Sequence, residues 1–264
     1  MQIQGNDPVI DKLLKGQDEI VFNLVHLIRG AKGARLFSDG THYLIAQGSA
    51  SAPLWLYVSA NLSGQAEREV FEILSKAKEE TGCLSINAQE KYAQEMLIRF
   101  AQENGLNLFK RDPLNAYFIR EVRSVAPVGK IISSVGHEET IAMLIQEAAI
   151  DDNDGELTCE QAMQFAKAHA ASGDLFLWED GLVASMARVV RYGRYARLTS
   201  IVTERAQRGK GYAKMLVGEL AKRLLLEGLT PVLYARSENP SSTRCYQSIG
   251  FEKAGEITEF KFLK

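Results

Sequence analysis

The residues best suited to chemistry lie where a predicted strand leads into a basic, glycine-rich loop and a long predicted helix. The segment reads Ile201-Val202-Thr203-Glu204-Arg205-Ala206-Gln207-Arg208-Gly209-Lys210-Gly211-Tyr212-Ala213. The first N–H groups of a helix lack partners and carry the positive end of its dipole, so they bind phosphate well. Gly209 and Gly211 let the backbone approach an anion closely, and Arg208 and Lys210 add positive charge. The segment predicts a phosphate-binding loop, with an ordinary strand–helix turn as the alternative.

The charge around this loop favours a polyphosphate ligand. Residues 188–223 contain ten Lys or Arg but only two acids, Glu204 and Glu219, which gives a local charge of +8 in a chain whose net charge is −2. For at least two of the arginines between Arg188 and Arg197, a solvated strand face is the simpler interpretation. Nucleic acid is not expected as a partner, because aromatic residues are few here and no nucleic-acid-binding motif occurs.

Competing phosphate and metal motifs fail on their spacing. No Gly stands five residues before Gly209, which excludes the Gly-x-x-x-x-Gly-Lys-Ser/Thr loop, and Lys214 replaces the third Gly of a dinucleotide fingerprint. Asp152, Asp154 and Gly155 suggest a calcium loop, but its first and last ligand positions would be Ile150 and Gln161, and neither is an acid. The Cys and His residues show no zinc spacing. We therefore expect no metal.

The elements that position the loop follow one order in both halves of the chain. The first half predicts strand 54–58, helix 65–81, strand 83–86, helix 88–104 and strand 106–109; the second predicts strand 197–202, helix 210–227, strand 231–235, helix 240–249 and strand 256–262. Residues 124–136 are poor in charge and hold Pro, Gly and Ser, which marks a junction. We predict an α/β (α+β) fold of two similar domains, residues 1–124 and 125–264, each a mixed central sheet flanked by helices.

Further elements are expected outside this shared order. They are a helical pattern over 8–28 interrupted at Gly16, strands 34–37, 42–47, 116–120, 175–178 and 183–192, and helices 138–149 and 159–170.

Composition places the chain among globular proteins of a reducing compartment. Of 264 residues, 46% are hydrophobic and 24% charged, close to the globular average. The three cysteines, Cys83, Cys159 and Cys245, are odd in number and far apart, which argues against a disulfide framework. No targeting segment and no apolar run of about 20 residues is present, so we expect a cytoplasmic protein without a membrane partner.

Two motifs in residues 125–264 resemble the GNAT superfamily of acetyl-CoA-dependent N-acetyltransferases. Arg208-x-x-Gly211-x-Ala213 matches that family's pyrophosphate loop, Gln/Arg-x-x-Gly-x-Gly/Ala. The second motif runs from Asn239 to Phe251 and matches the family's Asn-x-x-Ser-x-x-x-Tyr-x-x-x-Gly-Phe. The whole chain is similar to two-domain bacterial GNAT proteins, in which the N-terminal half is a degenerate GNAT-like copy. Residues 59–65 of that half hold one glycine and no cation, so we do not expect coenzyme A there.

The resemblance implies a set of site residues. Backbone groups of Ile201, Val202 and Thr203 would meet the pantetheine arm, and the Val202 N–H would stabilise the thioester oxyanion. Asn239 would contact the same arm or only cap its helix. The pyrophosphate would be wrapped by Arg208, Gly209, Lys210, Gly211, Tyr212 and Ala213.

The resemblance also implies a reaction, the transfer of acetyl from acetyl-CoA to a primary amine. Tyr246 would be the general acid on the departing thiolate, or an aromatic residue that packs the short helix. A phenol has a pKa of about 10 and a thiol about 8.5, so full proton transfer is uphill by roughly 2 kcal/mol.

No base is evident on strand 197–202, and Glu204 is the nearest acid. A non-catalytic acyl-CoA-binding or regulatory module is the alternative. The sequence does not identify the amine acceptor, and it leaves open whether the protein forms a homodimer.

Overall fold

The computed structural model describes residues 1–123, 128–151 and 157–263, and it divides the chain into two compact units. The first unit contains Met1–Tyr117, Tyr234–Asn239 and Lys253–Lys264; the second contains Phe118–Leu233 and Pro240–Glu252. The predicted boundary between residues 124 and 125 lies outside the described residues. By this division, residues late in the sequence contribute to the first unit, and residues just before position 124 contribute to the second.

The first unit is built on a mixed sheet whose strands run in the order β1-β2-β3-β4-β12. Pairing is antiparallel except between β3 and β4, and β5 also pairs with β12. The strands are β1 (Arg35–Ser38), β2 (Tyr43–Gln47), β3 (Leu54–Val58), β4 (Leu84–Ala88), β5 (Asn107–Lys110), β6 (Leu114–Phe118) and β12 (Glu252–Leu263); β6 and β12 each also extend into the second unit.

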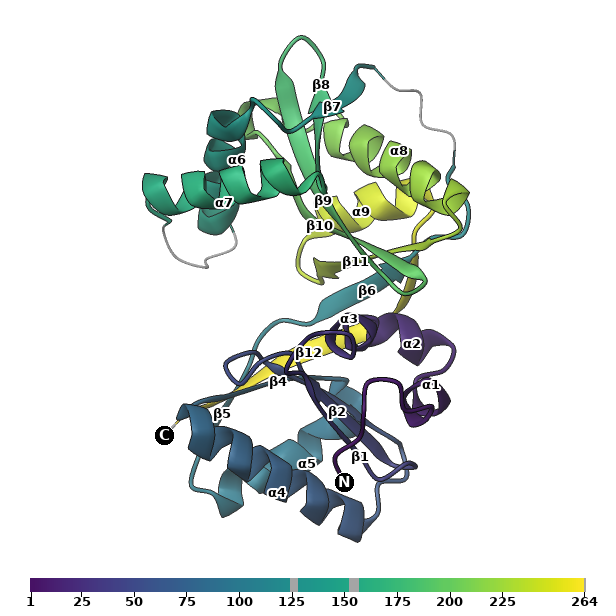
Figure 1. Cartoon of the computed structure of the whole chain (residues 1–264), viewed down its shortest axis with the longest axis vertical. Helices are drawn as coiled ribbons and strands as arrows, with labels where there is room; N and C mark the ends of the chain where they lie inside the picture. The colour runs from purple at the N-terminus through teal and green to yellow at the C-terminus, as the bar shows by residue number, and fades with distance from the viewer. Residues whose placement is uncertain (124–127, 152–156, 264) are drawn as a thin grey trace. The chain divides into compact units, whose positions relative to one another are not determined.

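Two long helices, α4 (Gly64–Thr81) and α5 (Glu90–Glu103), pack against this sheet (Figure 1). Apolar residues at helical spacing, such as Val70, Leu74 and Ala77, form one core with β3, β4 and two phenylalanines of β12. Gly82 ends α4 in the left-handed conformation, as its position after the apolar pattern predicts.

The start of the chain forms three short helices rather than the two predicted pieces. These are α1 (Val9–Leu13), α2 (Gln17–Val21) and α3 (Leu24–Ile28). The additional break lies at Asn23, which is fully buried and whose amide donates to the Ile20 carbonyl at 2.6 Å and to the Tyr234 hydroxyl at 2.7 Å. A side chain that bonds nearby backbone competes with helix continuation, and periodicity does not reveal such contacts.

The second unit has a sheet in the order β11-β10-β9-β8-β7, antiparallel except for β10 with β11. Figure 1 shows α6 and α7 on one side of its strands, and α8 and α9 on the other. Strand β7 falls in the stretch read from the sequence as a junction. The elements are β7 (Lys130–Ser133), α6 (Glu138–Asp151), α7 (Cys159–Ser172), β8 (Leu175–Glu179), β9 (Val183–Tyr192), β10 (Tyr195–Thr203), α8 (Tyr212–Leu226), β11 (Thr230–Arg236, shared with the first unit) and α9 (Pro240–Ile249).

The predicted α/β class, with mixed sheets flanked by helices, is confirmed. In the part of the chain that the structure describes, no helix is both long and apolar enough to cross a membrane.

Candidate functional site

The loop between β10 and α8 has the backbone geometry of an anion site. Gly211 is the N-cap of α8, with a φ of 87°, and no side chain caps the helix. Gly209 has a φ of 80°. A Cβ built on either glycine would meet nothing within 4 Å, so the space beside the loop is open. The N–H groups of the first turn of α8 therefore lack a side-chain acceptor, and an anion can approach them.

The corresponding helix of the first unit begins differently. The Ser63 hydroxyl caps α4 by accepting a hydrogen bond from the Ala66 N–H at 3.2 Å. A side-chain oxygen thus takes one of the donors that a phosphate would need. This difference favours the N-terminus of α8 over that of α4 as the phosphate site.

Strand β10 is bulged and has an open edge beside the loop. Its register with β9 shifts between Thr199 and Val202, and Ser200 has a φ of 49°, the one positive φ outside glycine among the described residues. Its parallel pairing with β11 covers Tyr195 to Arg197. In the described ladder that pairing does not continue along residues 198–203, which leaves backbone groups of this segment available to a ligand.

The register of this ladder argues against the expected oxyanion role of the Val202 N–H. The Glu204 N–H donates to the Ala184 carbonyl at 3.1 Å, and Val202 lies opposite Met186 two residues earlier. Hydrogen-bonded pairs recur every second residue in an antiparallel ladder, so the backbone of Val202 is directed toward β9. The Thr203 carbonyl instead accepts from Arg208 Nε at 3.1 Å. Thr203, rather than Val202, offers its backbone to the open edge.

Arg208 is engaged by protein groups rather than solvated alone. Besides Thr203, its guanidinium contacts Asp151, at 2.6 Å between Nη2 and Oδ2. Arg205 contacts the other oxygen of that carboxylate at 2.8 Å. The hydrogen bonds from Arg208 and Arg205 hold the pKa of Asp151 below its usual range. Lys210 Nζ donates to Gln207 Oε1 at 2.7 Å.

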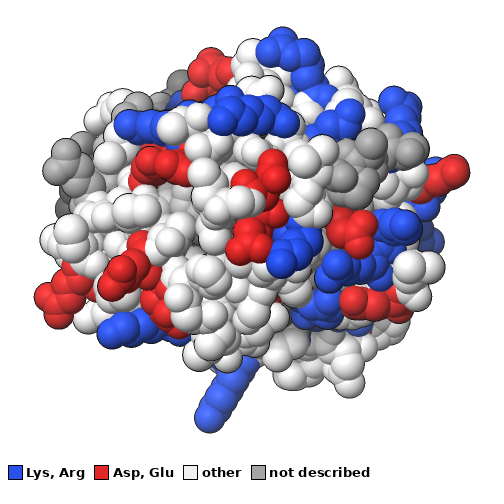
Figure 2. All heavy atoms as spheres, turned by 90° about the horizontal axis from the view of Figure 1, so that it is seen from above, with Lys and Arg blue, Asp and Glu red and all other residues white. Residues whose placement is uncertain are grey.

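Much of the local charge counted from the sequence is balanced by acids elsewhere in the chain. Arg188 pairs with Asp174 at 2.7 Å, and Arg191 pairs with Glu227 at 2.9 Å. Figure 2, which views the molecule from above Figure 1, shows Lys and Arg interspersed with Asp and Glu on that face. The count of +8 therefore overstates the local field, because a sequence window omits acids that folding brings to it.

The first residue of α8 is held by the turn between β8 and β9. The Tyr212 hydroxyl donates to Asp180 Oδ2 at 2.8 Å, and this hydrogen bond raises the pKa of Tyr212. The N-terminus of α8 is thus fixed by a contact that no spacing in the sequence reveals.

Tyr246 and Asn239 belong to different compact units. Tyr246 lies on α9, is buried, and packs edge to face against Phe251 with 6.0 Å between ring centroids. The Asn239 N–H donates to the Arg236 carbonyl at 3.1 Å. The packing interpretation of Tyr246 is therefore realised, and its role as general acid stays a prediction.

Cys245 is poorly suited to act as a nucleophile. Burial raises the pKa of its thiol to about 11, although Lys214 acts in the opposite direction. The reactive thiolate is scarce at neutral pH under these conditions. Among the described residues, no cluster of His, Cys, Asp and Glu could hold a metal ion.

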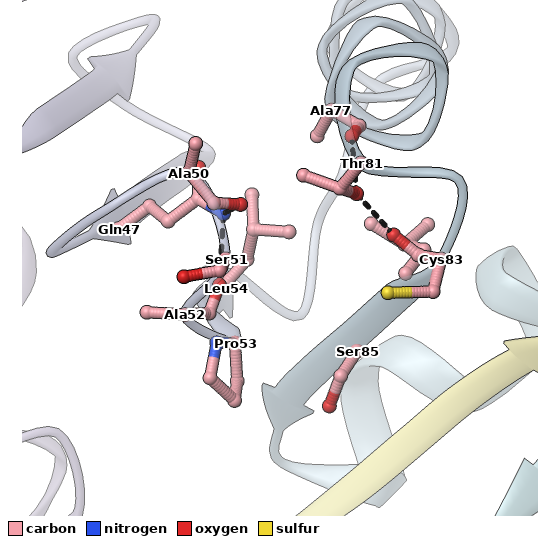
Figure 3. Close-up of a pocket in the computed structure, with 11 residues that line it drawn as sticks. Gln47, Ala50, Ser51, Ala52, Pro53, Leu54, Ala77, Thr81, Cys83 and Ser85 are labelled. Carbon is pink, nitrogen blue, oxygen red and sulfur yellow. Dashed lines mark hydrogen bonds between the residues drawn. The ribbon is translucent and has the colours of Figure 1, made fainter.

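A shallow hollow in the first unit offers no comparable chemistry. Figure 3 shows Thr81 on one side of it, where the hydroxyl lies within hydrogen-bond distance of two carbonyl oxygens, those of Ala77 at 2.9 Å and Cys83 at 2.6 Å. Thr81 and Gln47 bond the backbone of local turns, and the Ser85 hydroxyl donates to Glu259 Oε1 at 2.7 Å. The lining residues are Gln47, Ala50, Ser51, Ala52, Pro53, Leu54, Ala77, Thr81, Cys83, Leu84 and Ser85.

Comparison with protein families places a match over the second half of the chain. Residues 177–260 match the family model described as FR47-like protein. This range contains β10, the loop and α8. No curated protein matches the chain.

Solved structures share the fold at low sequence identity. A GNAT-family acetyltransferase from Colwellia psychrerythraea is 14% identical, with a TM-score of 0.57 over 100% of this chain and 99% of its own. A GCN5-related N-acetyltransferase from Kribbella flavida is 14% identical, with a TM-score of 0.60 over 93% and 94%. A tandem GNAT protein from the clavulanic acid biosynthesis pathway is 13% identical, with a TM-score of 0.51 over 100% and 97%. At these identities the likeness establishes the fold.

Proposed function

We infer the function from the fold. This chain has the tandem GNAT fold, and that finding confirms its predicted resemblance to the GNAT superfamily. This fold supports acyl transfer from acyl-CoA. We propose that the second unit binds acetyl-CoA at the loop before α8 and transfers the acetyl group to a primary amine. The observation that carries the proposal is the uncapped N-terminus of α8 at Gly211, next to the open edge of β10.

The residues present fit a diphosphate. Backbone N–H groups at the start of α8 would hold its oxygens, and Lys210 beside them supplies positive charge. Gly209 and Gly211 leave open space on the side where an anion would lie. The Thr203 end of β10 would offer its backbone to the amide groups of the pantetheine arm.

The reaction requires two proton transfers, one from the amine and one to the thiolate. The amine nitrogen attacks the thioester carbonyl carbon, and the C–S bond then breaks. Tyr246 is the proposed donor of the proton that the departing thiolate takes up. The amine must lose a proton, and β10 carries no Asp, Glu or His for that purpose. Glu204, directly after β10, is the nearest acid in the sequence. It is one candidate base, and a water-mediated base and an acceptor amine of lower pKa are the alternatives.

Calorimetric titration of acetyl-CoA into wild type, Arg208→Glu and Arg99→Glu tests the binding step. Arg208→Glu reverses a charge in the loop and should weaken binding tenfold or more. Arg99 is an exposed arginine of the first unit that pairs with Glu67, so Arg99→Glu makes the same charge change outside the loop's own unit and should bind like wild type. Absence of binding to wild type would refute the proposal.

A non-catalytic acyl-CoA-binding module is the second candidate, and the burial of Tyr246 against Phe251 favours it. The two candidates differ in turnover. An acetyltransferase releases free thiol from acetyl-CoA in the presence of an amine panel and is slowed by Tyr246→Phe. A binding module releases none with any amine, and Tyr246→Phe leaves its affinity unchanged.

A further inference from the structure

Two acids of α6 hold the loop that precedes α8. Glu147 and Asp151 are four residues apart and so lie on one face of the helix. Glu147 Oε2 accepts a hydrogen bond from the Arg205 backbone N–H at 3.2 Å. The two oxygens of Asp151 accept from Arg205 Nη2 at 2.8 Å and from Arg208 Nη2 at 2.6 Å. One carboxylate therefore joins both arginines of the loop to the end of α6.

The contact made by Asp151 continues to the open edge of β10. Arg208 uses its Nη2 for Asp151 and its Nε for the Thr203 carbonyl, at 3.1 Å. The planar guanidinium thus fixes the last residue of the strand relative to the loop. Displacement of Asp151 would release this arginine from α6 and weaken its hold on Thr203.

The glycine part of the loop, from Gly209 to Gly211, has little packing of its own, so contacts with other segments help to order it. Gly209 and Gly211 have positive φ and no neighbouring atoms where side chains would project. Glycine loses more conformational freedom on ordering than any other residue. A single exposed ion pair contributes little to order, but a carboxylate shared by two arginines restrains both together.

We propose that Asp151 is a positioning residue that presets the loop 204–211 for the diphosphate of acetyl-CoA. This inference rests on the proposed function. Asp151 holds Arg205 and Arg208 in place before the ligand arrives, so less ordering remains to be done on binding. The residue acts through the arginines, and its loss should affect affinity rather than the chemical step.

The test compares wild type, Asp151→Asn, Asp151→Glu and Glu219→Gln. Glu219 is the matched control, because it is an acid of α8 whose ion pair is with Arg223 of the same helix. Amide hydrogen exchange over residues 204–211 is measured in the ligand-free protein. Affinity for acetyl-CoA is then measured at about 0.3 M salt, which reduces the long-range part of the attraction that the added positive charge of Asp151→Asn exerts on the ligand.

We expect loop exchange about fivefold faster in Asp151→Asn, a Kd for acetyl-CoA about tenfold higher, and kcat at saturation within twofold of wild type. Asp151→Glu should recover part of both effects, and Glu219→Gln should match wild type. Unchanged exchange and Kd in Asp151→Asn would overturn the inference alone. Tighter binding would also overturn it, because it would mean that Asp151 competes with phosphate for Arg208. Absence of acetyl-CoA binding to wild type would overturn the proposed function and the inference with it.

Discussion

Separating the chain at residue 124 should leave an N-terminal fragment that does not fold. The first unit includes β12 from the far end of the chain, and residues 258–262 of that strand pair with residues 84–88 of β4. Phe260 and Phe262 belong to the core that α4 and α5 cover, and the Phe262 ring lies 5.6 Å from that of Phe100. A fragment of residues 1–124 lacks all of these groups.

The loss is comparable to the whole stability of a domain. Ile257, Phe260 and Phe262 are each at most 3% exposed. Burial of such side chains contributes about 1.5–3 kcal/mol each, so their removal costs roughly 5–9 kcal/mol. Domains have a total free energy of unfolding of about 5–15 kcal/mol. The exposed edge of β4 adds unpaired backbone groups to this loss.

Near-ultraviolet circular dichroism and an amide NMR spectrum of fragment 1–124 measure the outcome directly. We expect no near-ultraviolet signal, collapsed amide dispersion and no cooperative urea transition. In the intact chain, Phe260→Ala should lower the free energy of unfolding by about 3–5 kcal/mol. A dispersed spectrum and cooperative unfolding of the fragment would refute the reasoning and favour two independent domains.

Three further predictions concern single residues. Gly211→Ala should lower the free energy of unfolding by about 1 kcal/mol in urea titrations. An L-residue at positive φ costs about 1–2 kcal/mol, and the lower entropy of the unfolded chain offsets only part of that cost. The control Gly64→Ala, at the start of α4, should be neutral or stabilising. Burial acts to raise the pKa of Asp39, but hydrogen bonds, chiefly from His42, outweigh it and lower the pKa from 3.8 to about 2. Its carboxylate therefore stabilises the fold above about pH 4 and loses that effect as the pH falls through about 2, so Asp39→Asn should cost about 2 kcal/mol at pH 7 and nearly nothing at pH 2. At pH 8, iodoacetamide should label Cys83, which is exposed, well before Cys245, whose pKa burial raises to about 11; equal rates by mass spectrometry would contradict the burial argument.

The elements and the loop could be predicted because their signals are local. The apolar periodicity of residues 65–81 and the stop at Gly82 predicted α4 nearly to the residue. Likewise, Gly209 and Gly211 marked the two positions with positive φ before α8. In each case the residues that determine the backbone conformation are neighbours in the sequence, so a local pattern is enough to predict it.

What sequence reasoning missed depends on contacts between distant segments. The pairing of β12 with β4 joins residues 170 or more positions apart, and an apolar strand pattern does not identify the strand that it pairs with. The acids that neutralise the basic segment, such as Asp151 and Asp174, lie outside the window in which charge was counted. The orientation of Val202 follows from a one-residue bulge, which reverses the direction of backbone groups without changing composition.

The N-termini of α4 and α8 differ in a way that predicts anion binding at α8 alone. Ser63 caps α4, whereas Gly211 leaves α8 uncapped. Replacement of the cap alone, as Ser63→Gly, would free a donor but would not create a phosphate site, because residues 59–65 hold no cation and one glycine. On the proposal made above, anion binding at α8 would require the uncapped turn, the two glycines and a loop held in place by Asp151 and Asp180 together. We therefore expect Ser63→Gly to weaken the first unit by a few tenths of a kcal/mol without gaining acetyl-CoA binding there, and a second calorimetric site in that variant would refute this account.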